Sequence, residues 1–276
     1  MFLRNGPRSL LAVVAAALLF PSLSARATGS HAVDVLLHAH LASVRGELDP
    51  RAVVTLERID GLGRQLLATR SYLRAGATLG ERWSWSQAQI DRYEGSALQR
   101  ALESEIARVR AAFDAENPGY TLWVNPQVRS VELQVERWNE NPTVAAAADA
   151  MLAAIRREVA APEAPKPGSA AAREWFSGRL RSAVPSPTPP LAAPGLSRHG
   201  RMQAVDFQVK RGERIVAGAS QADIGPVWEA QGWCERLVRA VRLTSDRFAG
   251  PLVTPNEPWH YEVEAPADVV VASTGR

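Results

Sequence analysis

The apolar side chains of residues 31–115 recur every three or four positions, which is the spacing of one face of an α-helix. The clearest such stripe consists of Leu98, Leu102, Ile106, Val109 and Phe113. No other feature of the sequence limits the fold as strongly, because strand-like runs begin only after this region. Those runs are short, namely Thr121–Val124, Ala204–Val209 and Trp259–Val263. We therefore expect an α+β fold with few, short strands, preceded by a helical N-terminal region at 28–115.

The second half of the chain combines helices with proline-rich connections. Helical spacing predicts helices over Val131–Trp138, Val144–Val159 and Val227–Leu243, the last with Pro226 in its first turn. Prolines cluster near 161–170 and again near 184–195, where neither a central strand nor a long helix can continue. We expect both stretches to be surface crossings within a second domain at 116–266, followed by a tail at 267–276.

Residues 1–27 have the three parts of a secretory signal peptide. Arg4 and Arg8 supply positive charge, Leu10–Phe20 is an apolar run, and Ala25-Arg26-Ala27 fits the small-x-small pattern of a cleavage site. At about 1.5 Å per residue the run covers about half of a ~30 Å hydrocarbon core, which favours a cleaved signal over an uncleaved anchor. We expect a periplasmic or secreted protein with no stable membrane span after cleavage.

The charge balance excludes the usual signature of a nucleic-acid binder. The chain has 32 Lys and Arg and 29 Asp and Glu, a formal net charge of +3. The leader contains Arg4, Arg8 and Arg26 and no acid, so the net charge of the remainder is zero (3 − 3 = 0).

The single cysteine, Cys234, rules out an internal disulfide, which leaves packing or a bound metal to stabilise an exported fold.

Two short motifs near the C-terminus carry the chemistry. Asp206 follows His199 and interrupts an apolar strand, where a carboxylate is costly unless it is paired or binds a metal. Glu257 and His260 come later, and Pro258 biases Glu257 away from the helical region, so this pair enters a strand instead of sharing a helix face. Two histidines and one carboxylate suit a three-ligand zinc shell whose fourth position is open to water. A glutamate beside the second histidine can accept a proton from that water.

These motifs resemble those of a known family. The pattern Ser197-x-His199-x(6)-Asp206, followed by Glu257-Pro-Trp-His260, is similar to that of the zinc D-alanyl-D-alanine carboxypeptidases and dipeptidases, whose fold is shared with the hedgehog signalling domain and lysostaphin-like peptidases. The resemblance covers about residues 120–264. It implies that His199, Asp206 and His260 hold one zinc ion, that Glu257 is the general base, and that the sheet is small and antiparallel.

The resemblance also implies an arginine upstream that stabilises an oxyanion. In the family this arginine follows a strand and precedes a serine and, a few residues on, a glutamine, a pattern matched here by Arg129, Ser130 and Gln134. Ser197 and Trp259 are weaker candidates for substrate contact. One departure is Met202, where the family often has a small residue.

The best-supported expectation is an exported zinc peptidase that hydrolyses peptidoglycan stem peptides, as a D-Ala-D-Ala carboxypeptidase or a related endopeptidase. The alternative is a non-catalytic wall-binding or scaffold protein that keeps the peptidase fold, with the helical N-terminal region recruiting a protein partner. Glu257 favours the enzyme, because a pure binder has no use for a general base. A third alternative is an exported helical protein in which the motifs are coincidental.

Overall fold

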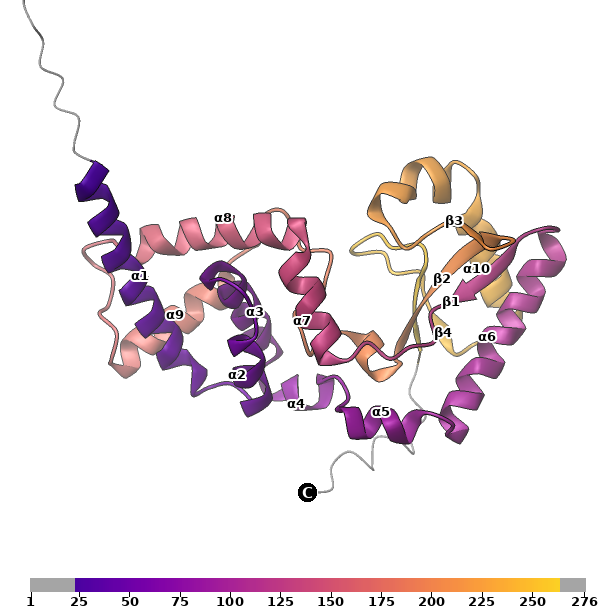
Figure 1. Cartoon of the computed structure of the whole chain (residues 1–276), viewed down its shortest axis with the longest axis horizontal. Coiled ribbons are helices and arrows are strands. Elements are labelled where there is room, and N and C mark those ends of the chain that lie inside the picture. The colour runs from indigo at the N-terminus through magenta and orange to yellow at the C-terminus, as the bar shows by residue number, and fades with distance from the viewer. Residues whose placement is uncertain (1–22, 264–276) are drawn as a thin grey trace, which may run out of the picture.

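The computed structural model describes residues 23–263, with side chains from residue 31 onward. Within this range the chain forms ten α-helices and a five-stranded antiparallel sheet, which confirms the expected α+β class (Figure 1). None of the described helices combines the length and apolar character needed to cross a bilayer. Residues 1–22 of the predicted signal peptide, and the predicted tail at 267–276, lie outside the described residues.

Helices from both halves of the sequence share the first hydrophobic core. They are α1 (Leu23–Arg45), α2 (Pro50–Glu57), α3 (Leu62–Ala75), α4 (Leu79–Arg82), α7 (Val131–Glu140), α8 (Pro142–Val159) and α9 (Ala170–Ser182). Asn141 starts α8 by accepting hydrogen bonds from the backbone N–H groups of Thr143 and Val144 at 2.9 and 3.0 Å. Gly63 allows α3 to approach α8, since a Cβ there would lie 2.7 Å from the Ala148 carbonyl oxygen.

The second core is formed by the sheet and three α-helices. Its elements are α5 (Gln87–Tyr93), α6 (Ala97–Glu116), β1 (Thr121–Val124), β2 (Ala204–Arg211), β3 (Arg214–Ala217), α10 (Trp233–Thr244), β4 (Phe248–Ala249) and β5 (His260–Val263). The strand order is β1-β2-β5-β4, with β3 also paired to β2. The predicted stripe on α6 faces this core, where Val109 and Phe113 are fully buried.

The boundary expected at residues 115/116 does not coincide with the division between the two cores. The helix α6 packs with the sheet and α10, whereas α8 and α9 pack with the N-terminal helices (Figure 1). The apolar face of α6 packs mainly against β1 and α10, which come later in the chain. The two proline-rich stretches do form loops, one between α8 and α9 and one leading from α9 back to the sheet.

The helix predicted over 227–243 is wrong in its first third. The structure has a π-helical turn, η4 (Ile224–Glu229), and α10 begins only at Trp233. Gly232, with φ of 70°, separates the two elements in the left-handed conformation that a continuous helix cannot include. Pro226 consequently lies inside the π-helical turn and not in the first turn of α10.

Candidate metal centre

The antiparallel pairing of β2 with β5 places Asp206 directly opposite His260. Opposing residues of such a pair project to the same face of the sheet, and their side chains are close enough to touch. The neighbours Val205 and Phe207 point to the other face, where they are 2% and 0% exposed in the second core. The alternation that buries Val205 and Phe207 therefore directs the Asp206 carboxylate toward the imidazole of His260, and one oxygen lies 3.1 Å from Nδ1.

His199 reaches the same point from η2 (Arg198–Arg201), a short 3₁₀ turn ahead of β2. The turn ends at Met202, which has φ of 50° and ψ of 33° in the left-handed region. Glycine adopts this conformation without cost, whereas a residue with a Cβ adopts it rarely. Here methionine takes the left-handed conformation while its side chain is buried in the second core.

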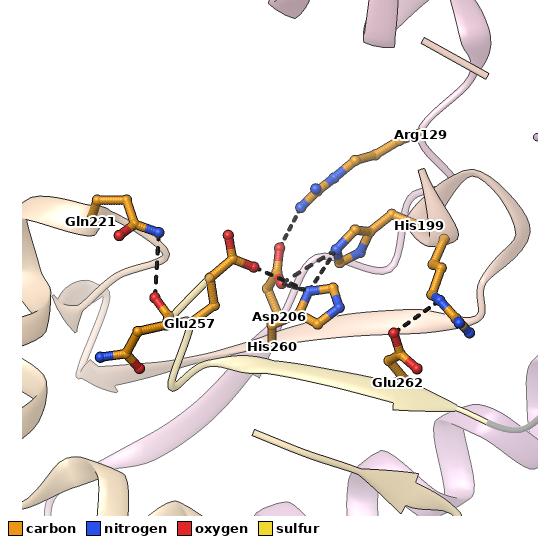
Figure 2. A network of polar contacts seen from close by, with 9 residues as sticks. Arg129, His199, Asp206, Gln221, Glu257, His260 and Glu262 are labelled. Atoms are coloured by element: carbon orange, nitrogen blue, oxygen red, sulfur yellow. Dashed lines mark hydrogen bonds and ion pairs between the residues drawn. The ribbon is translucent and has the colours of Figure 1, made fainter. Parts of the chain in front are cut away.

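Three donor atoms from these residues face one another (Figure 2). His199 Nε2 lies 3.2 Å from His260 Nδ1 and 3.4 Å from Asp206 Oδ1, and the latter two atoms are 3.1 Å apart. Zn–N and Zn–O bonds of about 2.0–2.1 Å at tetrahedral angles put neighbouring donors about 3.3 Å apart. The side chains are only 10–12% exposed. His199, Asp206 and His260 thus form a site that could hold a metal ion, as predicted, and the spacing of its donors fits a small tetrahedral cation.

The protonation states of the cluster suit a metal site. Burial lowers the pKa of His199 to about 3, and the charge of Asp206 only partly offsets this effect. Burial alone would raise the pKa of Asp206, but the hydrogen bond from His260 and the charges of His199 and Arg129 lower it to about 2. A neutral imidazole and an ionised carboxylate at neutral pH are the forms that bind metals.

Glu257 lies at the edge of the cluster without joining the three donors. Its Oε2 is 3.7 Å from His260 Nδ1, and its side chain is 15% exposed. The turn that carries it is fixed by hydrogen bonds from Glu257 N–H to the Leu252 carbonyl and from His260 N–H to the Glu257 carbonyl, at 2.9 and 3.0 Å. Gln221 supports the same turn by donating to the Asn256 carbonyl (Figure 2). Burial raises the pKa of Glu257, and the charges of His260 and Arg129 oppose this shift.

Arg129 binds the outer side of the Asp206 carboxylate. Its Nη2 donates to Asp206 Oδ2 at 2.6 Å, while the other oxygen, Oδ1, faces the two histidines. The Arg129 backbone N–H also donates to the His199 carbonyl at 3.4 Å. The structure thus brings Arg129 to the site, as expected, with its guanidinium held on a ligand carboxylate.

The two weaker candidates lie beside the cluster in different settings. Ser197 is half-buried, and its carbonyl accepts a hydrogen bond from the Gly200 N–H at 3.0 Å. Trp259 is 4% exposed and packs in the second core against Trp228, at 6.0 Å between ring centroids, so little of its surface faces solvent. Glu262, on the same strand face as His260, pairs with Arg198 at 2.9 Å (Figure 2).

Two further residues adjoin the site and were not among the predicted site residues. Ser84 comes from the segment between α4 and α5 and hydrogen-bonds the loop before His199. Gln134, on α7, hydrogen-bonds the Arg129 carbonyl. Gln134 had a sequence signal, its spacing from Arg129, whereas Ser84 had none, because a lone serine between two tryptophans fits any turn.

Comparison of this chain with family models, with curated proteins and with solved structures gives no match in any of the three. The geometry of the site is therefore the basis for the functional argument that follows.

Proposed function

We propose that this protein is an exported zinc-dependent peptidase that hydrolyses peptidoglycan stem peptides. The observation that carries the proposal is the cluster of three donors 3.1–3.4 Å apart with the Glu257 carboxylate 3.7 Å from one of them. The motif resemblance adds a fold like that of the hedgehog and D-Ala-D-Ala peptidase group for the sheet-containing part. The predicted leader at 1–27 supports a periplasmic or secreted location.

His199, Asp206 and His260 are the residues that would hold the metal. Two imidazoles and one carboxylate are a donor set that zinc accepts in catalytic sites, which keep one position open. When bound, zinc supplies Lewis acidity toward a carbonyl oxygen and lowers the pKa of water to about 7.

Glu257 is the residue placed to move a proton. Burial raises its pKa toward neutral pH. A pKa raised in this way suits a group that takes a proton from water and later passes it to a leaving amine. The 3.7 Å separation from His260 Nδ1 leaves Glu257 beside the ligand set and outside it. The turn before β5 fixes this arrangement, because Glu257 and His260 are joined by a backbone hydrogen bond.

Arginine side chains give the site positive charge. Arg129 stabilises the ionised form of Asp206 and lies where negative charge on a scissile carbonyl would be favoured. Arg137, on α7, adds positive charge nearby: partial burial and the charge of Arg129 lower its pKa, and the charge of Asp206 raises it.

The test combines metal analysis with digestion of muropeptides that end in D-Ala-D-Ala. The expected result is one zinc per chain and release of D-alanine, with Glu257→Gln retaining zinc and losing activity by about 100-fold or more. Glu213→Gln is the matched control, since Glu213 is 99% exposed and pairs with Lys210 at 3.0 Å on the surface. Full activity in Glu257→Gln would refute the mechanism. Zinc binding with no turnover on any muropeptide would favour the wall-binding alternative.

A further inference from the structure

The segment that joins the two cores between α4 and α5 runs beside the loop that carries His199. Trp83 is the last residue of this segment that packs in the first core. It is 7% exposed and packs against Tyr72, with 5.7 Å between the ring centroids. The next two residues turn to the loop: Ser84 N–H donates to the Gly195 carbonyl at 2.7 Å, and Trp85 N–H donates to the Gly200 carbonyl at 2.9 Å. The helical N-terminal region is therefore tied directly to the backbone on both sides of His199.

The side chains of Ser84 and Gln134 form a buried polar pair at this junction. They are 3% and 7% exposed. Gln134 Nε2 donates to Ser84 Oγ at 3.0 Å and to the Arg129 carbonyl at 2.6 Å, while its Oε1 accepts from Gly195 N–H at 2.9 Å. Ser84 Oγ lies 3.1 Å from the Gly195 carbonyl. One amide thus connects the Arg129 turn, the loop before His199 and the segment from the first core, with both of its polar atoms satisfied.

The packing around Gly200 shows that the side chains of Ser84 and Gln134 lie directly against the backbone next to His199. A Cβ on Gly200 would lie 2.2 Å from Ser84 Oγ and 2.7 Å from Gln134 Nε2. Gly200 is the residue immediately after His199, and the His199 carbonyl accepts a hydrogen bond from the Arg129 N–H at 3.4 Å. Loss of the Gln134 amide would therefore release the Arg129 carbonyl and the Gly195 N–H, and loss of the Ser84 hydroxyl would remove one bond to the loop before His199.

We propose that Ser84 and Gln134 are positioning residues that set the distance between His199 and Arg129. This inference rests on the proposed function for its catalytic meaning, because the geometry that it controls is that of the donor cluster. It assigns the helical N-terminal region a role as part of the framework of the site. Groups that orient metal ligands without touching the metal typically change metal affinity by 10–100-fold.

The experiment is a titration of the purified metal-free protein with Co²⁺, followed by its visible absorption, which reports ligand geometry. The variants are Ser84→Ala and Gln134→Met, either of which is sufficient if the other fails to fold. Their matched controls are Ser71→Ala and Gln65→Met, which remove a hydroxyl and an amide that bond only carbonyls near α3, at Leu67 and Ile59. Thermal unfolding identifies the variants that are folded before titration.

The expected result is at least about tenfold weaker cobalt binding and an altered absorption spectrum in both site variants, with neither change in the controls. Folded site variants with wild-type affinity and spectrum would overturn the inference. If the wild-type protein binds no cobalt and no zinc, the proposed function fails, and amide exchange in the metal-free protein decides the positioning role. Faster exchange at Arg129 and Gly200 in Ser84→Ala, but not in Ser71→Ala, would support it, and unchanged exchange would refute it.

Discussion

Asp206 uses its two carboxylate oxygens for different partners: Oδ1 lies 3.1 Å from His260, and Oδ2 accepts from Arg129 at 2.6 Å. This division keeps one oxygen available to a metal while the other holds a positive charge in place. The arrangement follows from strand register, since His260 is the direct partner of Asp206 across β2 and β5.

Asp206→Ala should abolish tight metal binding. Loss of the carboxylate leaves only two of the three donors and removes the only negative charge within the cluster, so we expect zinc affinity to fall by more than about 100-fold. Competition with a chromophoric chelator measures this change. The control is Asp91→Ala, whose carboxylate bonds Gln87 on the exposed face of α5. Retention of wild-type zinc affinity by Asp206→Ala would contradict the assignment of the site.

Arg129→Ala should destabilise the fold by about 1–3 kcal/mol, because it leaves the nearly buried Asp206 carboxylate without its charged donor. Arg129→Lys should recover part of the loss, since lysine keeps the charge and lacks the planar donor fork. Urea unfolding at neutral pH gives both values. Arg58→Ala, which breaks an exposed pair with Glu132 at 2.9 Å, should cost less than about 1 kcal/mol. Equal losses for Arg129→Ala and Arg58→Ala would show that the Asp206 pair contributes no more than a surface pair.

The metal-free protein should lose stability on acidification below pH 6.5. The unfolded chain protonates His199 near 6.5, whereas the folded chain does so near 3, so the unfolded state binds more protons between these values. The free energy of unfolding therefore decreases as the pH is lowered, by up to about 1.4 kcal/mol per pH unit from this group. Asp206, with its pKa lowered from 3.8 to about 2, adds a second loss below pH 4.

Unfolding by urea at several pH values, with a chelator present, measures this dependence. His199→Gln should flatten the slope between pH 6.5 and 4, and His38→Gln, an exposed residue of α1, should leave it unchanged. An identical slope in His199→Gln and the wild type would contradict the prediction.

Gly63→Ala should destabilise the first core by about 1–3 kcal/mol, because the new methyl would overlap the Ala148 carbonyl between α3 and α8. Gly178→Ala, in α9 with no atom within 4 Å of the added Cβ, should instead stabilise the protein by about 0.5–1 kcal/mol. Thermal or urea unfolding of the two variants compares them directly. A stable Gly63→Ala variant would show that the two helices separate without cost.

Local patterns predicted the elements better than their partners. The stripe on α6 predicted a helix and its buried face, and the short apolar runs predicted β1, β2 and β5. The partner of that stripe depends on contacts between residues far apart in sequence, which periodicity does not contain. Apolar spacing alone does not reveal the break at Gly232, so the predicted helix begins earlier than α10 does.

The same distinction applies to the site. Histidine and carboxylate side chains bind metals and transfer protons, so residue type and spacing are enough to single out His199, Asp206, Glu257 and His260. The structure brings all four together. Ser84 could not be predicted, because its contribution comes from a hydrogen bond across 111 positions to Gly195. Trp259 lies in the turn just before β5 and is buried in the second core, so its side chain belongs to the packing of that core.

The order in which the chain visits the two cores limits how the protein can be dissected. After the N-terminal helices of the first core, the chain passes through Ser84 to α6 and β1 of the second core. It then forms α8 and α9 in the first core, and finally β2 and β5 in the second. A single truncation near residue 116 would separate α6 from the sheet, and it would also separate α8 from the N-terminal helices against which it packs. By contrast, one protease nick between α8 and α9 would yield two fragments that each retain helices of the first core and strands of the sheet, and they would remain associated without a peptide link.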